Sequence, residues 1–396
     1  MDYEKYDSML RTQVLSLPGM VQEQVESCFN EQKLRSSLPV EQAKTAKRVF
    51  ISGCGDSNPV GTVLLKTFKE LSGIEDCFAM DPMEFSRYLK KEDFGQEGES
   101  LAIAVSARGG SARISEMLLK ADACGGVPIL ITDGRKSKAA EKARYCYFLD
   151  APPMANAVPG LRSYFSCLVG FLAAGCSIGL ARESLTLGRV EGLAEQITRY
   201  VQSYDKLMEE WDQKCFETAW DWREFKRFEF VGNASGVFSA YFSSMKFYES
   251  SGVCCRYVGV DDWVWAEQQG EEADKVGTMF LLHKSEPGYQ KGMEMALSAS
   301  KKRRIMVISD DNQLQSTPNV TFVPLIPPKD GAGWLVSLMD YCPASLVASA
   351  HCMMSGRKKK YYKDADGKIR TEDPTQMKFL NPELKTQHNS RCEIHL

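Results

Sequence analysis

Histidine is scarce in this sequence, with four residues among 396. A catalytic histidine pair or a histidine-based metal cage is therefore disfavoured. The thirteen cysteines form no Cys-x-x-Cys pair, and Cys254 and Cys255 are adjacent rather than spaced, which also argues against zinc. We therefore predict a protein without a metal site.

An export signal is also missing, because Met1-Asp2-Tyr3-Glu4-Lys5 starts no apolar segment. With 13 cysteines in 396 residues, the chain is too poor in cysteine for a disulfide scaffold. We predict reduced cysteines and a cytoplasmic location. The longest nearly apolar stretch, 167–181, is shorter than the roughly 20 residues that a membrane span requires, and it predicts a buried helix.

The charge balance has no basic excess, since 49 Lys and Arg face 52 Asp and Glu and leave a net charge of −3. Binding to a polyanion such as nucleic acid is therefore disfavoured. The chain also lacks a Gly-x-Gly-x-x-Gly motif with a later acidic residue, and it lacks a P-loop. Dinucleotide and P-loop nucleotide binding are therefore disfavoured too.

An internal repeat relates the two halves of the chain. Residues 48–73 align with 227–252 without gaps at an offset of 179, which matches Gly53 with Gly232 and Phe68 with Phe247. At the same offset 101–106 align with 280–285, and two residues of slippage bring 129–133 onto 306–310. Each copy repeats a short apolar run, a Gly/Ser turn and a longer helical pattern. This arrangement predicts an α/β protein with two tandem doubly wound parallel sheets.

We predict five segments along the chain. They are a helical N-terminal segment (1–47) with a break near Pro18-Gly19, a first sheet domain (48–182), a helical connector (183–225), a second sheet domain (226–355) and a C-terminal tail (356–396). The tail carries Lys358 to Lys360 and is polar, which predicts a segment that is disordered or lies over a partner.

Two loops of the first half are rich in Gly and Ser, residues 52–59 (SGCGDSNP) and 106–111 (SARGGS). In an open parallel sheet, ligands bind at the carboxyl ends of the strands, where the strand order reverses. Backbone N–H groups, hydroxyls and an arginine at a helix start suit a phosphate. Gly and Ser also serve turn geometry alone. The presence of both loops on strands expected to be neighbours favours anion binding.

These loops, together with 83–86 (MEFS) after the second apolar run, resemble the SIS (sugar isomerase) phosphosugar-binding family. The duplicated arrangement is similar to the isomerase half of glutamine–fructose-6-phosphate aminotransferase and to fructosamine-6-phosphate deglycases, over roughly residues 45–355. The resemblance implies two SIS-type, flavodoxin-like domains that bind a carbohydrate derivative, a role in amino-sugar metabolism, and a cytoplasmic homodimer. It implies no metal or organic cofactor.

The resemblance also implies which residues bind the sugar phosphate. They are Gly55, Asp56, Ser57, Ser106, Ala107, Arg108, Gly109, Ser111, Val158 and Gly160. The family usually has small hydroxyl residues where this chain has Ala107 and Arg108. Arg108 would then strengthen phosphate binding or contact a carboxylate on a larger substrate. Residues 158–160 stand where the family brings backbone against the sugar, although a simple Pro-Gly turn explains them equally well.

The family's catalytic base lies in a Lys-x-x-Glu pattern that matches Lys246 and Glu249. A spacing of three places both side chains on one helical face, where the ammonium keeps the carboxylate ionised. The family's Glu-Phe-x-His-Gly-Pro-like stretch has no histidine here, since 257–267 reads YVGVDDWVWAE. Asp261 or Asp262 is left for the acidic position and Glu267 for an acid or base, while the two tryptophans suit either packing or sugar stacking.

The resemblance therefore implies a deglycase or an aldose–ketose isomerase that acts on an amino-linked or keto sugar 6-phosphate by proton transfer between C1 and C2. The second-half loop 285–290 has gained Glu286 and lost most hydroxyls, so we expect one phosphate site per chain. The alternative is a non-catalytic sugar-phosphate sensor or regulator.

Overall fold

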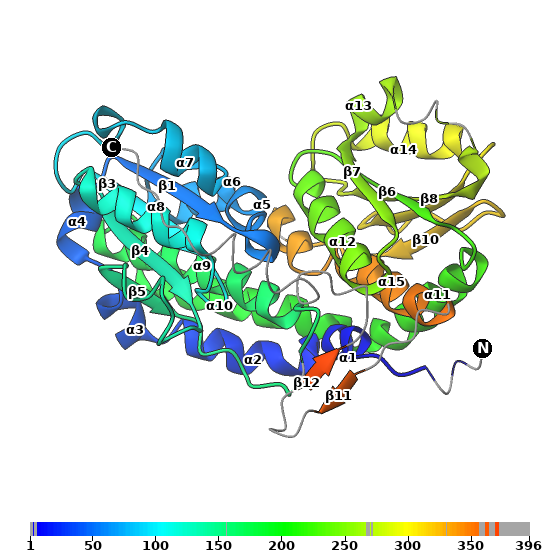
Figure 1. Cartoon of the computed structure of the whole chain (residues 1–396), viewed down its shortest axis with the longest axis horizontal. Coiled ribbons are helices and arrows are strands. Elements are labelled where there is room, and N and C mark those ends of the chain that lie inside the picture. The colour runs from blue at the N-terminus through cyan, green and yellow to red at the C-terminus, as the bar shows by residue number, and fades with distance from the viewer. Residues whose placement is uncertain are drawn as a thin grey trace. The chain divides into compact units, whose positions relative to one another are not determined.

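The computed structural model describes residues 3, 6–155, 157–266, 270, 272–329, 331–355, 361–363 and 369–371. The chain divides into two compact units, each built on one five-stranded parallel sheet (Figure 1). We call them the β1–β5 unit, which comprises residues 20–153 and 162–199, and the β6–β10 unit, which comprises the described residues of 1–19, 154–161 and 200–382. The predicted α/β class with two doubly wound sheets is confirmed.

The sheet of the β1–β5 unit has the strand order β2-β1-β3-β4-β5, and all its strands are parallel. In this flavodoxin-like order, β2 lies on one side of β1 and β3 on the other, so the order of the strands in the sheet reverses between β1 and β3. The strands are β1 Arg48–Gly53, β2 Asp76–Ala79, β3 Ser100–Val105, β4 Val127–Thr132 and β5 Tyr145–Phe148.

Helices cover both faces of this sheet. On one face α6 packs against α9, and on the other α7 packs against α8. The helices from α2 to α10 are α2 Leu17–Cys28, α3 Glu31–Ser36, α4 Val40–Thr45, α5 Val60–Val63, α6 Leu65–Ser72, α7 Pro82–Tyr88, α8 Ala112–Ala123, α9 Arg162–Ala181 and α10 Leu187–Gln202.

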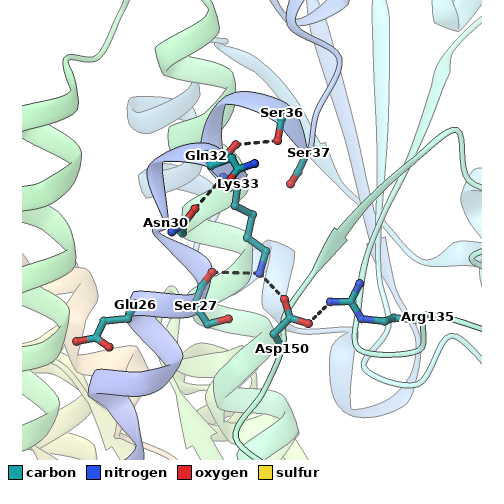
Figure 2. Close-up of a pocket in the computed structure, with 9 residues that line it drawn as sticks. All are labelled: Glu26, Ser27, Asn30, Gln32, Lys33, Ser36, Ser37, Arg135 and Asp150. Carbon is teal, nitrogen blue, oxygen red and sulfur yellow. Dashed lines mark hydrogen bonds and ion pairs between the residues drawn. The ribbon is translucent and has the colours of Figure 1, made fainter.

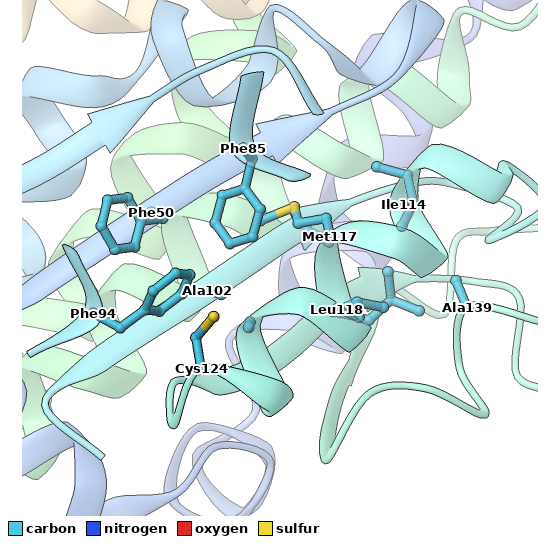
Figure 3. Close-up of a cluster of buried hydrophobic side chains, with 12 residues drawn as sticks. Phe50, Phe85, Phe94, Ala102, Ile114, Met117, Leu118, Cys124 and Ala139 are labelled. Atoms are coloured by element: carbon cyan, nitrogen blue, oxygen red, sulfur yellow. The ribbon is translucent and has the colours of Figure 1, made fainter. Parts of the chain in front are cut away.

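A cluster of buried side chains joins the sheet to α7 and α8 (Figure 3). The ladder places Phe50 opposite Ala102, and both residues face this cluster. The small alanine leaves room for aromatic rings, so Phe50 packs edge-on against Phe85 of α7 at 5.8 Å between ring centroids and lies 5.2 Å from Phe94. The start of α7 is defined locally, because the Asp81 side chain accepts a hydrogen bond from the N–H of Met83.

The other face of the sheet packs on α9, the helix predicted from the apolar stretch. It has 20 residues and a mean hydropathy of 1.8, enough by length and composition to cross a membrane, but 89% of its most apolar window is buried. The approach is close at Gly170, where a Cβ atom would lie 2.1 Å from Leu149. The predicted buried helix is therefore confirmed as the core helix of this unit.

The β6–β10 unit repeats the same strand order, as β7-β6-β8-β9-β10. Its strands are β6 Arg227–Gly232, β7 Cys254–Gly259, β8 Val276–Leu282, β9 Arg304–Ser309 and β10 Val320–Pro324. Its helices are α1 Met9–Leu15, α11 Met208–Asp221, α12 Gly236–Ser251, α13 Val260–Trp265, α14 Tyr289–Ala299 and α15 Cys342–Met354. A short antiparallel pair, β11 Tyr361–Lys363 and β12 Ile369–Thr371, is all that the structure describes of the predicted tail.

The internal repeat is confirmed for two of the three aligned strands. β1 and β6 are related by the predicted offset of 179, and the pairing of β4 and β9 with their neighbours gives the predicted offset of 177. The alignment of 101–106 with 280–285 was wrong. The ladders place Leu101 beside Val49 and Gly277 beside Phe228, so the true offset of this strand is 176. Both registers put apolar residues on apolar residues, and hydropathy alone could not separate them.

The N-terminal helices break at Ser16, two residues before Pro18, and Pro18-Gly19 lie in the first turn of α2, where proline needs no N–H partner. The predicted domain boundaries differ in the structure. The N-terminal segment and the connector are both divided between the two units, at 19/20 and 199/200. The segment 154–161, expected inside the first domain, belongs to the β6–β10 unit.

Replacing Phe85 by alanine should remove about 3–5 kcal/mol from the unfolding free energy of the β1–β5 unit, because the ring is fully buried among two other phenylalanines. Urea unfolding followed by circular dichroism measures this change. The matched control is Tyr88→Ala on the same helix, which removes a ring that is 77% exposed and should change stability by less than about 0.5 kcal/mol. Equal effects of the two changes would contradict the assigned core.

Candidate functional site

The two Gly/Ser loops leave neighbouring strands at the point where the strand order reverses. Gly53 at the end of β1 pairs with Val105 at the end of β3, so both loops start at the same edge of the sheet. The loop after β1 leads to α5 and α6, and the loop after β3 leads to α8 on the opposite face. The loops therefore diverge at the position where doubly wound sheets bind ligands, which we call the crevice.

The loop after β1 turns back immediately. A Cβ atom on Gly53 would lie 2.1 Å from the carbonyl oxygen of Ser57, and Gly55 has a positive φ of 62°, so both positions require glycine. Ser57 is buried, with its Oγ 3.9 Å from the Sγ of Cys167 on α9. Burial raises the pKa of Cys167 to about 12, so this thiol adds no negative charge to the loop.

The loop after β3 is held by its own backbone and by the loop after β4. The N–H of Gly109, with φ of 59°, donates to Ser106 at both its Oγ and its carbonyl oxygen, each at 3.2 Å. The carbonyl of Ala107 accepts from the N–H of Asp133 at 3.0 Å and from the Thr132 hydroxyl at 3.2 Å. Arg108 is exposed at the tip, where its guanidinium can contact an anion.

Ser111 connects the two loops at the start of α8. Its Oγ donates to the Sγ of Cys54 at 3.4 Å, and its side chain makes no capping bond to its own helix. An α-helix leaves its first N–H groups without intrahelical partners and carries partial positive charge at that end. The crevice between the loops therefore combines the start of a 12-residue helix with hydroxyl groups and an arginine. This combination suits a phosphate.

The equivalent crevice of the β6–β10 unit is filled by its own side chains. The Ser235 hydroxyl, after β6, donates to Oε1 of Glu286, after β8, at 3.0 Å. The Asn233 amide donates to the carbonyl of Pro287 at 2.6 Å. A carboxylate therefore occupies the position between the loops and repels other anions. This arrangement supports the expectation of one phosphate site per chain.

Lys246 and Glu249 form a pair near the C-terminus of α12. The Lys246 ammonium is fully buried and donates to Oε2 of Glu249 at 2.6 Å, while the Glu249 side chain is 15% exposed. Because α12 runs back from the carboxyl end of β6 to the start of β7, this pair lies at the amino edge of its sheet, away from the crevice with Glu286. The carboxylate thus has no part in that crevice.

The backbone of 154–161, which includes Val158 and Gly160, is fixed by polar side chains of the β6–β10 unit. Lys246 donates a second hydrogen bond, 2.9 Å long, to the carbonyl of Gly160. The Gln13 amide donates to the carbonyl of Pro159 at 2.7 Å and accepts from the N–H of Leu161 at 2.8 Å. These hydrogen bonds to buried side chains explain why the segment belongs to the β6–β10 unit instead of the predicted first domain. They also bring the predicted Gly160 together with the predicted catalytic pair.

The candidate residues of the segment 257–267 differ in their burial and in their partners. Asp261 forms an exposed ion pair with Lys291 on α14. Of the two tryptophans, Trp263 is buried and donates to Glu229, while Trp265 is 79% exposed. Glu267 lies outside the described residues.

Two of the four histidines lie in the described residues, and both are buried in the β6–β10 unit. His283 lies 2.8 Å from Asp340 and is 1% exposed, and His351 is fully buried. Burial opposes protonation of His283, but the adjacent Asp340 carboxylate outweighs it and raises the pKa of this imidazole. Neither histidine reaches a surface site as folded. Within the described part of the chain, no three His, Cys, Asp or Glu side chains cluster in a way that could hold a metal ion.

The described residues form a duplicated doubly wound fold with two Gly/Ser loops at the strand-order reversal of its first sheet. A family model described as the SIS domain matches residues 44–174, which contain all of β1 to β5 and both loops. Residues 44–174 are therefore similar to the SIS domain, the family that the sequence resembles. No curated protein matches the chain in sequence.

Solved structures match both halves of the chain. The C-terminal domain of glucosamine-fructose-6-phosphate aminotransferase from Francisella tularensis matches with a TM-score of 0.74 and 14% identity, over 90% of this chain and 98% of that one. Tagatose-6-phosphate ketose/aldose isomerase from Escherichia coli matches with a TM-score of 0.64 and 14% identity, over 90% and 96%. Glucosamine-6-phosphate deaminase from Thermotoga maritima matches with a TM-score of 0.62 and 14% identity, over 88% and 95%. At these identities the likeness establishes the fold.

Changing Ser106 and Ser111 together to alanine should weaken binding of fructose 6-phosphate by about 2–4 kcal/mol, at roughly 1–2 kcal/mol for each hydrogen bond lost to a charged partner. Isothermal titration calorimetry measures the affinity, and thermal melting verifies that the variant is folded. The matched control is Ser285→Ala in the second half, which should bind like the wild type. Unchanged affinity in a folded double variant would contradict the assigned phosphate site.

Proposed function

We propose that this protein is a sugar-phosphate enzyme, an isomerase or deglycase, that binds the 6-phosphate of its substrate between the loops after β1 and β3. The observation that carries the proposal is the start of α8 at the strand-order reversal, where Ser106 and Ser111 flank the helix N-terminus. The SIS family match to this segment supports it. In this proposal Gly55, Asp56, Ser57, Ala107, Arg108 and Gly109 complete the phosphate-binding loops.

The proposed proton carrier is Glu249. Its carboxylate is partly exposed and accepts a hydrogen bond from the buried Lys246 ammonium, so a positive charge lies beside the proposed base. For isomerisation, the carboxylate takes the proton from C1 or C2 to form an enediol and returns it to the neighbouring carbon. Val158 and Gly160 are proposed to place backbone against the sugar near this pair.

The deglycase reaction uses the same first step. The base removes a proton from C1 of the ketoamine, and the resulting enolamine is protonated at C2, which leaves a C1=N bond. Water adds to this imine, and its hydrolysis releases the amine and the aldose phosphate. Neither reaction requires a metal or an organic cofactor, since only protons and one water molecule move. The proposed setting for this chemistry is the cytoplasm.

A second candidate function, a non-catalytic sugar-phosphate sensor, is favoured by one observation. The segment 257–267 has no histidine where the family resemblance expects the residue that opens the sugar ring. A sensor would need the phosphate loops but no base. The role of Glu249 therefore separates the two functions.

Replacing Glu249 by glutamine should lower turnover by roughly 10²-fold or more, because glutamine keeps the shape and hydrogen bonding but removes the basicity. Sugar-phosphate affinity should stay within a few-fold. The measurement is solvent deuterium exchange at C1 and C2 of bound fructose 6-phosphate and glucosamine 6-phosphate, followed by NMR. Glu210→Gln, which breaks an exposed ion pair with Lys214 on α11, is the matched control and should exchange normally.

Three results of this experiment are distinguishable. Loss of exchange in the Glu249 variant alone supports the enzyme. Exchange that survives in the variant moves the base to Glu267 or Asp262. An absence of exchange in the wild type, with several sugar phosphates tightly bound, selects the sensor.

We also propose that the active unit is a homodimer, because the family resemblance implies sites completed by a second subunit and neither described histidine reaches one. Analytical ultracentrifugation should show a dimer at the concentrations used for activity. An active monomer at nanomolar concentration would refute this assignment.

A further inference from the structure

One buried side chain of the N-terminal helix, Gln13 of α1, holds the backbone around Gly160. Its side chain has no solvent exposure, although glutamine is mostly a surface residue. The amide donates from Nε2 to the carbonyl of Pro159 at 2.7 Å and accepts at Oε1 from the N–H of Leu161 at 2.8 Å. A carbonyl requires a donor and an N–H requires an acceptor, so the two partners together fix the orientation of the amide. Gln13 therefore contacts the peptide groups on both sides of Gly160.

The peptide group between Gly160 and Leu161 links Gln13 to Lys246. This bond is trans, and a trans peptide group points its N–H and its C=O in opposite directions. The N–H donates to Gln13, while the C=O accepts from the Lys246 ammonium at 2.9 Å. Lys246 also donates to Glu249 at 2.6 Å. A displacement of this peptide group would therefore move a partner away from the ammonium that lies beside the proposed base.

The helix that carries Gln13 is itself anchored by polar contacts. Arg11 of α1 donates to both carboxylate oxygens of Asp212 on α11, at 2.6–3.0 Å, and Asp212 is buried. Ser8, directly before α1, accepts a hydrogen bond from Ser349 of α15 at 2.5 Å. The same helix α15 packs against α12, which carries Lys246. Packed helices hold side chains more precisely than loops do, so this arrangement suits a positioning role.

We infer that Gln13 is a positioning residue, which holds the Gly160 backbone against the sugar and in contact with Lys246. The inference rests on the proposed function, which places Gly160 near the sugar and assigns the base to Glu249, and it adds the residue that holds this arrangement in place. Gln13 acts through the peptide groups that it contacts and takes no part in proton transfer. Binding and rate both depend on geometry, so loss of these contacts affects both, whereas a merely structural contact affects stability alone.

The β1–β5 unit contains a matched glutamine for comparison. Gln24 of α2 is equally buried, donates to the carbonyl of Leu149 at 3.0 Å and accepts from the hydroxyl of Ser166 at 2.5 Å. The residue after Leu149 is Asp150, which lines a polar pocket at the end of α2 (Figure 2). Gln24 therefore ties α2 to the end of β5, in a different unit from Lys246. Its replacement should cost stability without moving the Gly160 backbone.

The test replaces each glutamine by methionine in the full-length chain. Methionine keeps the length of the side chain but forms neither hydrogen bond, so both variants should melt several degrees lower than the wild type. In Gln13→Met, calorimetry should show about tenfold or more weaker binding of fructose 6-phosphate, and deuterium exchange at C1 of the saturating sugar should slow by about tenfold or more. Backbone amide exchange, followed by mass spectrometry, should be faster at 159–161. In Gln24→Met, affinity and C1 exchange should stay within about twofold of the wild type.

A conservative variant, Gln13→Glu, tests for rescue. A protonated carboxyl can donate to the Pro159 carbonyl and accept from the Leu161 N–H, as the amide does, but an ionised carboxylate has no donor. Affinity and C1 exchange, each divided by the wild-type value at the same pH, should therefore recover between about pH 8 and about pH 5 as the carboxyl is protonated. Gln13→Met should show no such recovery.

The outcomes separate this inference from the proposed function. Unchanged affinity and C1 exchange in folded Gln13→Met, or equal losses in Gln24→Met, would overturn the inference and leave the proposed function intact. If Gln13→Met does not fold, absence of recovery in Gln13→Glu would overturn it. A wild type that binds fructose 6-phosphate without C1 exchange would overturn the proposed enzyme, and the affinities alone then decide the role of Gln13. Failure of the wild type to bind any sugar phosphate would overturn both.

Discussion

The reversal of strand order between β1 and β3 is the constraint on which the rest of the site depends. Two parallel strands that end side by side, with their following helices on opposite faces, cannot close the space between their loops. The local details follow from that geometry. The chain after β1 must turn back at once, and this is why Gly53 has no room for a Cβ atom. The loop after β3 must lie apart from the loop after β1, and hydrogen bonds from the loop after β4 hold it there.

The second unit shows how little chemistry separates a ligand crevice from a filled one. It has the same strand order and a matching glycine, Gly232, whose Cβ atom would lie 2.3 Å from the backbone of Gly236. One difference is a carboxylate, since Glu286 accepts a hydrogen bond from the Ser235 hydroxyl between the two loops. A built-in anion satisfies the donors that would otherwise bind phosphate. The two units therefore share one framework, and in the second unit an acidic side chain fills the position that is proposed to hold phosphate in the first.

Much of the fold could be predicted from the sequence, because a parallel sheet buried on both faces leaves short apolar runs and Gly/Ser turns that repeat. The starts of β1 and β6, the burial of α9 and the adjacency of the two loops all followed from such patterns. Register did not follow, because the apolar residues of β8 fit two alignments three residues apart. The sequence pattern also could not predict that 154–161 belongs to the β6–β10 unit. It is decided by hydrogen bonds from Gln13 and Lys246, residues far away in sequence.

The candidate site was predictable only where a local pattern carried it. The phosphate loops are contiguous motifs, and the helical spacing of Lys246 and Glu249 places them on one face. The contact of Gln13 with the peptide groups beside Gly160 joins residues that are 146 and 148 positions apart, and Gln13 stands in no recognisable motif. Only the structure shows that one peptide group links Gln13 to Lys246.

The missing histidine and the Lys246 pair together bear on the kind of substrate. A fully buried ammonium is stable only with partners, and here the Glu249 carboxylate and the Gly160 carbonyl supply them. An ionised base without a neighbouring acid can start a reaction only where the C–H bond is already acidic or the carbonyl already open. A protonated nitrogen on C1 withdraws electrons from the adjacent C–H bond and makes it more acidic. If Glu249 is the base, as proposed, the absence of a histidine from 257–267 therefore favours an amine-linked sugar phosphate over a simple cyclic aldose.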